Sequence, residues 1–141
     1  GIRLEADATL AAVERQDFDL IALPGGMPGA QHLKDDPRIA ALVRRLHGMG
    51  RPVAAICAAP MVLDAAGVLA GRRATSYPGF LEGADAAAVV GDAVVVDRGV
   101  ITSRGPGTAL DFALALVEQL EGRAARQAIE SRLERVKTAA A

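Results

Sequence analysis

An apolar stretch without polar alternation predicts a buried strand that runs directly into a helix. Residues 53–56 read Val-Ala-Ala-Ile, which is typical of a strand covered on both faces. Cys57 follows at once, and Pro60 stands where the first helical turn is expected. Proline is tolerated at that position because the N–H that it lacks would have no helical partner. The pattern therefore places Cys57 between a buried strand and a helix that ends near Gly67.

The rest of the chain alternates strand patterns with helix patterns. Further strands are expected at residues 2–4, 17–23, 73–76, 89–90, 94–96 and 100–102. Further helices are expected at about residues 9–13, 27–33, 37–47, 109–120 and 123–136. Strands that alternate with helices indicate an α/β fold, in which a mostly parallel sheet carries helices on both faces.

Polar residues ahead of the helix patterns predict how three helices begin. Asp7 is expected to cap the first short helix, and Asp36 to cap the helix that starts at Pro37. Thr108 and Asp111 predict a capping box for the helix at 109–120. Four apolar residues at helical spacing are expected to form the core face of the helix that starts at Pro37: Ile39, Leu42, Val43 and Leu46.

Glycine-containing pairs between the valine-rich strands predict two hairpin turns, at Gly91-Asp92 and at Arg98-Gly99. Residues 103–107 predict a tight loop that opens the next helix. The stretch from Ser103 to Thr108 is also a candidate for chemistry, because a glycine-rich loop that opens a helix can hold an anion. This loop lacks the lysine and the spacing of a P-loop, so a structural turn is the favoured interpretation.

Composition narrows the functions that the chain can have. Its 141 residues are 51% hydrophobic, enough for one domain with a sizeable core. The net charge of −1 and the aromatic content of 3% argue against a nucleic-acid surface. No stretch reaches the roughly 18 apolar residues that a membrane span needs. A single cysteine excludes an internal disulfide and fits a reducing compartment, so we expect a cytoplasmic protein.

Cys57 is the first candidate for chemistry. At the carboxyl end of a strand in an open α/β sheet it would lie where ligands bind, and the positive end of the following helix favours the thiolate. A buried cysteine that acts as a small hydrophobe explains the local pattern equally well.

Gly25-Gly26 is the second candidate, because it ends another apolar strand at the same edge of the sheet. Its backbone N–H groups could form an oxyanion hole beside Cys57, although an ordinary turn is the favoured interpretation of these two residues alone. His32 and His47 are expected to be solvated surface residues. One cysteine and two histidines at these spacings make no metal site.

Several segments, taken together and in order, point to a known family. They are residues 23–26 (Leu-Pro-Gly-Gly), 29–31 (Gly-Ala-Gln), 54–60 (Ala-Ala-Ile-Cys-Ala-Ala-Pro), 102–108 (Thr-Ser-Arg-Gly-Pro-Gly-Thr) and 112–114 (Phe-Ala-Leu). In these segments the chain resembles the DJ-1/PfpI (ThiJ) superfamily, and most closely its DJ-1 and YajL branch, from about residue 1 to residue 121. The resemblance implies a single domain with a flavodoxin-like α/β sandwich, without a cofactor or a metal and usually assembled as a homodimer.

The resemblance also implies roles for individual residues. Cys57 would be the reactive cysteine, easily oxidised to the sulfinate, and the backbone N–H groups of Gly25, Gly26 and Ala58 would bind the oxyanion. Tyr77 would line the pocket, at a place where several family members have histidine. Tyrosine is a poor base near neutral pH, which weakens any interpretation as a Cys-His hydrolase.

In the family, a glutamate on an N-terminal segment partners the cysteine. No carboxylate of this chain matches that glutamate by motif. We therefore expect that the chain begins after that segment, and that about one βαβ unit of roughly 30 residues is absent.

The activities that the resemblance implies are glyoxalase III, which converts methylglyoxal to lactate without glutathione, protein deglycation, and redox-regulated chaperoning. We predict a DJ-1/YajL-like stress protein whose Cys57 thiolate acts on methylglyoxal-derived aldehydes and adducts. The alternative is a redox-sensing chaperone, in which oxidation of Cys57 regulates partner binding without turnover. The expected partners are a small carbonyl substrate or client proteins and a second copy of the chain, with no nucleic acid and no membrane.

Overall fold

The centre of the molecule is a four-stranded sheet in a computed structural model that describes residues 2–135. Its strands are β1 (Ile21–Leu23), β2 (Val53–Ile56), β5 (Val94–Asp97) and β6 (Val100–Ser103), in the order β1-β2-β6-β5. The pairs β1–β2 and β2–β6 are parallel, and β5 is antiparallel to β6. The prediction of a mostly parallel sheet is confirmed.

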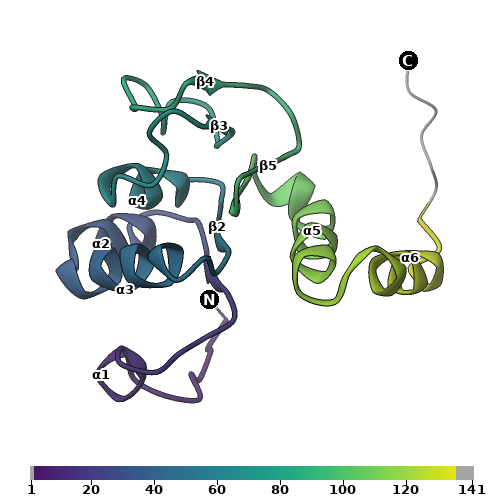
Figure 1. Cartoon of the computed structure of the whole chain (residues 1–141), viewed down its shortest axis with the longest axis horizontal. Helices are drawn as coiled ribbons and strands as arrows, with labels where there is room; N and C mark the ends of the chain where they lie inside the picture. The colour runs from purple at the N-terminus through teal and green to yellow at the C-terminus, as the bar shows by residue number, and fades with distance from the viewer. Residues whose placement is uncertain (1, 136–141) are drawn as a thin grey trace.

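Helices cover both faces of this sheet, as predicted (Figure 1). The helices are α1 (Leu10–Val13), α2 (Gly29–Asp35), α3 (Pro37–Gly48), α4 (Pro60–Ala65), α5 (Ala109–Glu121) and α6 (Arg123–Arg132). Helices α2, α3 and α4 lie together on one side of β2, and α5 lies on the other side (Figure 1). Helix α6 packs along α5. Helix α6 ends at Arg132 rather than near the expected residue 136, which itself lies outside the described residues.

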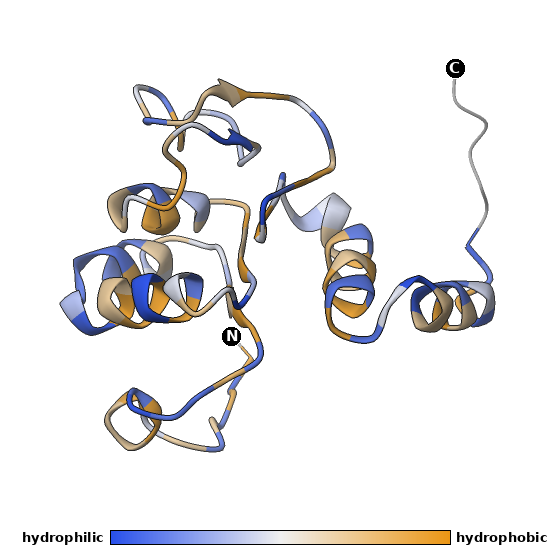
Figure 2. Ribbon diagram, viewed as in Figure 1, coloured by the Kyte–Doolittle hydropathy of each residue, from blue (hydrophilic) through white to orange (hydrophobic). Residues whose placement is uncertain are grey.

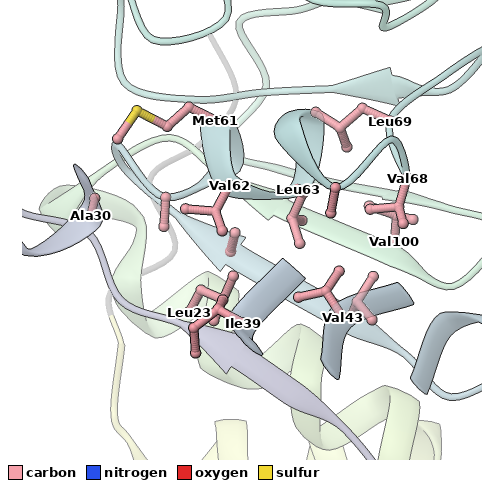
Figure 3. Packing of buried hydrophobic residues seen from close by; sticks show 14 of the residues in the cluster. Leu23, Ala30, Ile39, Val43, Met61, Val62, Leu63, Val68, Leu69 and Val100 are labelled. Atoms are coloured by element: carbon pink, nitrogen blue, oxygen red, sulfur yellow. The ribbon is translucent and has the colours of Figure 1, made fainter. Parts of the chain in front are cut away.

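The larger part of the core lies between the sheet and helices α3 and α4. Side chains of these helices, among them Val43 and Leu63, converge on Val100 of β6 (Figure 3). The four residues predicted for the core face of α3 are all buried, with Val43 and Leu46 fully inaccessible. Polar and apolar colouring alternates around α3, as expected for a helix with one buried face (Figure 2). Within residues 2–135, no helix is long and apolar enough to cross a membrane.

The predicted helix starts at Pro37, Pro60 and Ala109 are confirmed, whereas the caps predicted at Asp7 and at Thr108 are wrong. Helix α3 begins at Pro37, and the Asp36 side chain accepts a hydrogen bond from the Arg38 backbone N–H at 2.9 Å. Helix α4 begins at Pro60. The N-cap of α1 is Thr9 rather than Asp7, and its side chain makes no capping hydrogen bond.

The capping box predicted at Thr108 is absent from the start of α5. The Thr108 hydroxyl turns back instead, to within 2.7 Å of the Ser103 hydroxyl and 3.1 Å of the Gly105 amide. Asp111 forms an ion pair with Arg135 at 2.7 Å. Both side chains therefore have nearer partners than the amides that a capping box would satisfy.

The strand predictions need three corrections. Residues 2–4 form no strand, and Ile2 and Leu4 are exposed without a pairing partner. Strand β1 begins at Ile21 rather than at residue 17. Strand β4 (Ala88–Val89) pairs in parallel with β3 (Arg73–Ala74) in a separate small sheet. The hairpin predicted at Gly91-Asp92 is therefore wrong, because β4 and β5 belong to different sheets.

The second predicted hairpin, between β5 and β6, is confirmed. Arg98 and Gly99 connect these antiparallel strands with positive φ angles of 48° and 80°. Two consecutive positive φ angles are those of a type I′ turn, whose twist matches that of the flanking strands.

Candidate active site

Cys57 occupies a sharp turn at the carboxyl end of β2. Its backbone N–H donates to the Ser103 carbonyl at 2.9 Å, which continues the β2–β6 pairing by one residue. Its φ angle of +66° then turns the chain away from the strand, so that α4 begins three residues later. A side chain in this left-handed region costs about 1–2 kcal/mol. Hydrolase nucleophiles are presented on strained strand-to-helix turns of the same kind.

Cys57 is partly buried rather than fully enclosed. This excludes the interpretation of Cys57 as a fully enclosed small hydrophobe, which the sequence had left open. The positive φ angle was not predicted, since nothing in the residues around a cysteine signals a left-handed backbone.

Gly25 lies directly against Cys57, as its place at the end of the neighbouring strand predicted. A Cβ atom built on Gly25 would lie 2.6 Å from Cys57 Cβ and 2.8 Å from the Ile56 carbonyl oxygen. Both distances are far below van der Waals contact, so the close approach of the two chain segments requires glycine. Ala58 belongs to the same group, because its amide nitrogen is 3.2 Å from that built atom.

Gly26 needs glycine for a different reason. Its φ angle is +86°, and a Cβ atom there would meet nothing within 4 Å. Glycine is therefore favoured at position 26 by its backbone conformation, whereas at position 25 it is needed because a larger residue has no room.

Three backbone amides at the Cys57 turn and just beyond the end of β1 have no acceptor within residues 2–135. They belong to Gly25, Gly26 and Ala58, and none of them donates to a carbonyl or side-chain oxygen of the described part of the chain. Unpaired N–H groups next to a nucleophile are the donors that an oxyanion needs. Their function as an oxyanion hole stays a prediction.

Tyr77 is held beside Cys57 by the backbone, because the Tyr77 N–H donates to the Cys57 carbonyl at 2.8 Å. The tyrosine side chain is half exposed and packs edge-on against Phe80, with ring centroids 6.2 Å apart. Together with Pro78 and residues 104–108 it lines a groove of about 300 Å³. Cys57 is not among the residues that line this groove, so the role of Tyr77 in a pocket around the cysteine stays a prediction.

His32 and His47 differ in their surroundings. His32 is exposed, as predicted. His47 is partly buried, with its Nε2 atom 3.1 Å from Arg72 Nη2, so its prediction as a solvated residue is wrong. Burial and the Arg72 charge lower the pKa of His47. Within residues 2–135 there is no group of three His, Cys, Asp or Glu side chains that could hold a metal ion.

A strand–cysteine–helix turn with glycine packed against it agrees with a comparison of the sequence with known families. The sequence profile of the DJ-1/PfpI family matches residues 1–119. The chain belongs to the DJ-1/PfpI family. It is 43% identical over 126 residues to the protein DJ-1 homolog A of Arabidopsis thaliana. The matched region covers 87% of this chain and 32% of the plant protein.

Two further DJ-1/PfpI relatives carry names that describe an activity. The chain is 42% identical over 125 residues to the glutathione-independent glyoxalase DJR-1.2 of Caenorhabditis elegans, covering 86% of this chain and 66% of the relative. It is 37% identical over 108 residues to a deglycase of Pyrococcus horikoshii, covering 75% of this chain and 64% of the relative. The chain thus spans between about a third and two thirds of the length of these relatives.

Solved structures of the family confirm the flavodoxin-like α/β fold. The fold superimposes on DJ-1beta of Drosophila melanogaster with a TM-score of 0.87 at 39% identity, covering 94% of this chain and 72% of the other. It superimposes on oxidized DJ-1 of Toxoplasma gondii with a TM-score of 0.88 at 37% identity, covering 94% of this chain and 73% of the other.

Proposed function

We propose that this DJ-1/PfpI protein converts small α-oxo aldehydes such as methylglyoxal to hydroxy acids without glutathione, through Cys57. The observation that carries the proposal is the set of backbone amides of Gly25, Gly26 and Ala58, which lie at the Cys57 turn or on the segment packed against it and have no acceptor in the described residues. The glyoxalase and deglycase names of relatives that are about 40% identical support the same chemistry. Adducts of methylglyoxal on protein side chains present a related carbon and are the second proposed substrate class.

In the proposed reaction, the Cys57 thiolate forms a bond with the aldehyde carbon, and the carbonyl electron pair moves to the oxygen. The unpaired amides stabilise this oxyanion, which develops only after the attack. A base then moves a proton from the former aldehyde carbon to the neighbouring carbonyl carbon, which produces a thioester of lactate. Water cleaves the C–S bond and returns the thiolate, so methylglyoxal and water give lactate without an external oxidant. The glutamate that partners the family's cysteine has no motif match in this chain.

The test is formation of lactate from methylglyoxal in the absence of glutathione. The parent chain is compared with Cys57→Ser and Cys57→Ala, and lactate is quantified directly, because thiols also deplete methylglyoxal by simple addition. We expect lactate formation to fall to the uncatalysed rate in both variants. A Cys57→Ser protein that forms lactate at the parent rate would contradict the proposal.

A second function is favoured by the partial exposure of Cys57. Under this proposal Cys57 is a redox sensor, whose oxidation by two equivalents of peroxide gives a sulfinate and two molecules of water. The sulfinate oxygens would accept hydrogen bonds from the same amides, and the change in charge would alter binding of client proteins or of a second copy of the chain. A mass increase of about 32 Da that changes partner binding, in a protein without aldehyde turnover, would favour the sensor over the enzyme.

A further inference from the structure

The register of the sheet places Arg104 next to Cys57. Strands β2 and β6 are parallel, and their last paired residues are Ile56 and Ser103. The next residue of β2 is Cys57 and the next residue of β6 is Arg104, and the hydrogen bond from the Cys57 N–H to the Ser103 carbonyl holds the two ends together. Neighbouring parallel strands lie about 4.8 Å apart, so the two residues begin at adjacent backbone positions.

Among the described residues, Arg104 is also the only charged one along the groove that Tyr77 lines. The other residues of that groove are Pro78, Gly105, Pro106, Gly107 and Thr108, none of them ionisable. Gly105 brings the loop against the Tyr77 ring, with its built Cβ atom 3.4 Å from Tyr77 Cδ2. The groove of about 300 Å³ is large enough for a small organic molecule, and its single charge is positive.

Several N–H groups of the Arg104 guanidinium make no hydrogen bond within the described residues. Within residues 2–135 it forms no ion pair, and its Nη1 atom donates to the Gly91 carbonyl at 3.2 Å. That bond anchors one nitrogen and leaves Nε and Nη2 for a ligand. Arg104 also lines a second groove of about 370 Å³, in which Glu82 is an opposing charge. The groove shared with Tyr77 therefore has the better electrostatic match to an anion.

We infer that Arg104 is a specificity-determining residue, which binds the anionic group of substrates that react at Cys57. The favoured substrates are then α-oxo aldehydes that carry a carboxylate, ahead of neutral ones and of adducts on cationic side chains. The substrate class rests on the proposed function, whereas the anion preference at the thiol can be measured without turnover.

The first experiment compares the rates at which iodoacetate and iodoacetamide alkylate Cys57. The two reagents place similar groups on sulfur, but only iodoacetate carries a charge. We expect Arg104→Gln to lower the iodoacetate-to-iodoacetamide rate ratio by roughly two- to five-fold, the effect of one partly exposed charge pair. Arg104→Lys should keep most of the ratio, and the matched control Arg44→Gln, a charge removed from the exposed part of α3, should not change it. Added salt should reduce the difference between parent and Arg104→Gln.

An unchanged ratio in Arg104→Gln, or an equal loss in Arg44→Gln, would overturn the inference. A second experiment measures kcat/KM for 4,5-dioxopentanoate and for its neutral methyl ester, with 2-hydroxyglutarate and its ester as products. We expect a preference for the carboxylate that Arg104→Gln abolishes. Turnover of both compounds without that preference would overturn the inference and leave the proposed function standing. If neither compound is turned over while the alkylation ratio depends on Arg104, the proposed function fails and the anion site remains.

Discussion

Gly25 and Cys57 approach so closely that no side chain fits between their strands, since a Cβ atom on Gly25 would lie 2.6 Å from Cys57 Cβ. The contact joins the ends of β1 and β2, which are paired in parallel through Leu23 and Ala55. It fixes the distance between the Cys57 turn and the amides of residues 25 and 26. The geometry of the candidate site therefore depends on the absence of a methyl group at one position.

Replacement of Gly25 by alanine should disturb both stability and thiol chemistry. The added methyl group would overlap Cys57 Cβ and the Ile56 carbonyl, and neither is the flexible end of a side chain. We expect a loss of about 1–3 kcal/mol in the free energy of unfolding, measured by urea denaturation, because overpacking forces backbone shifts. The rate of Cys57 alkylation should change as well, since the turn that presents the thiol must move.

Gly29→Ala is the matched control for this prediction. Gly29 is the first residue of α2, and a Cβ atom there meets nothing within 4 Å. Alanine should leave stability unchanged or raise it by up to about 1 kcal/mol. If Gly25→Ala and Gly29→Ala had the same effect, the close contact would not be structurally important.

The left-handed backbone at Cys57 predicts an unusual order of stability among its variants. Glycine in place of alanine normally lowers stability, because it increases the entropy of the unfolded chain. At a φ angle of +66° alanine keeps the strain, while glycine relieves it. We expect Cys57→Gly to be about 0.5–1 kcal/mol more stable than Cys57→Ala in urea denaturation. A Cys57→Gly protein less stable than Cys57→Ala would show that the turn is not strained.

The sequence predicted the elements whose signals are local. The apolar run from Val53 to Ile56 is by itself enough to predict the buried strand β2. Asp36 and Pro37 predicted the start of α3, because an N-cap residue and a proline both act within the first turn of a helix. The order of these elements also predicted that Gly25 and Cys57 meet, since carboxyl ends of parallel strands share one edge of the sheet.

The failures concern choices between competing partners. Strand β4 pairs with β3 across 15 residues rather than with β5, which follows it directly, and no residue at Gly91-Asp92 encodes that choice. The Thr108 hydroxyl could either cap α5 or pair with the Ser103 hydroxyl, and in the folded chain it pairs with Ser103. The loop that contains Arg104 was interpreted as a structural turn for a related reason, since only the register of β2 and β6 sets Arg104 beside Cys57.

The contact between His47 and Arg72 predicts that stability falls as the pH is lowered. His47 Nε2 is 3.1 Å from Arg72 Nη2, so the neutral imidazole accepts a hydrogen bond that the protonated ring cannot accept. Burial and the Arg72 charge lower the pKa of His47 in the folded protein, below the value of about 6.5 expected in the unfolded chain. The unfolded state then binds more protons between these two pKa values, and the free energy of unfolding decreases as the pH falls through that window.

The measurement is urea denaturation between pH 8 and pH 5 of the parent, His47→Gln and His32→Gln. Glutamine can still accept a hydrogen bond from Arg72 but does not titrate, so His47→Gln should lose less stability between pH 7 and pH 5 than the parent. His32 is exposed, and His32→Gln should follow the parent profile. Parallel profiles for the parent and His47→Gln would contradict the assignment of this pH dependence to His47.

We expect the side chains of Ser103 and Thr108, whose hydroxyls meet beside the loop that contains Arg104, to be energetically coupled to each other. The two oxygens are 2.7 Å apart, Ser103 is fully buried, and the Thr108 oxygen also accepts from the Gly105 amide at 3.1 Å. Thr108→Val should lower the free energy of unfolding by about 1–3 kcal/mol, because it leaves the buried Gly105 amide without an acceptor and removes one partner of the Ser103 hydroxyl, whereas Thr108→Ser should be nearly neutral. In the double variant Ser103→Ala/Thr108→Val the losses should not add, and the coupling free energy should exceed about 0.5 kcal/mol. Additive losses in this double-mutant cycle, measured by urea denaturation, would mean that the two hydroxyls stabilise the loop independently.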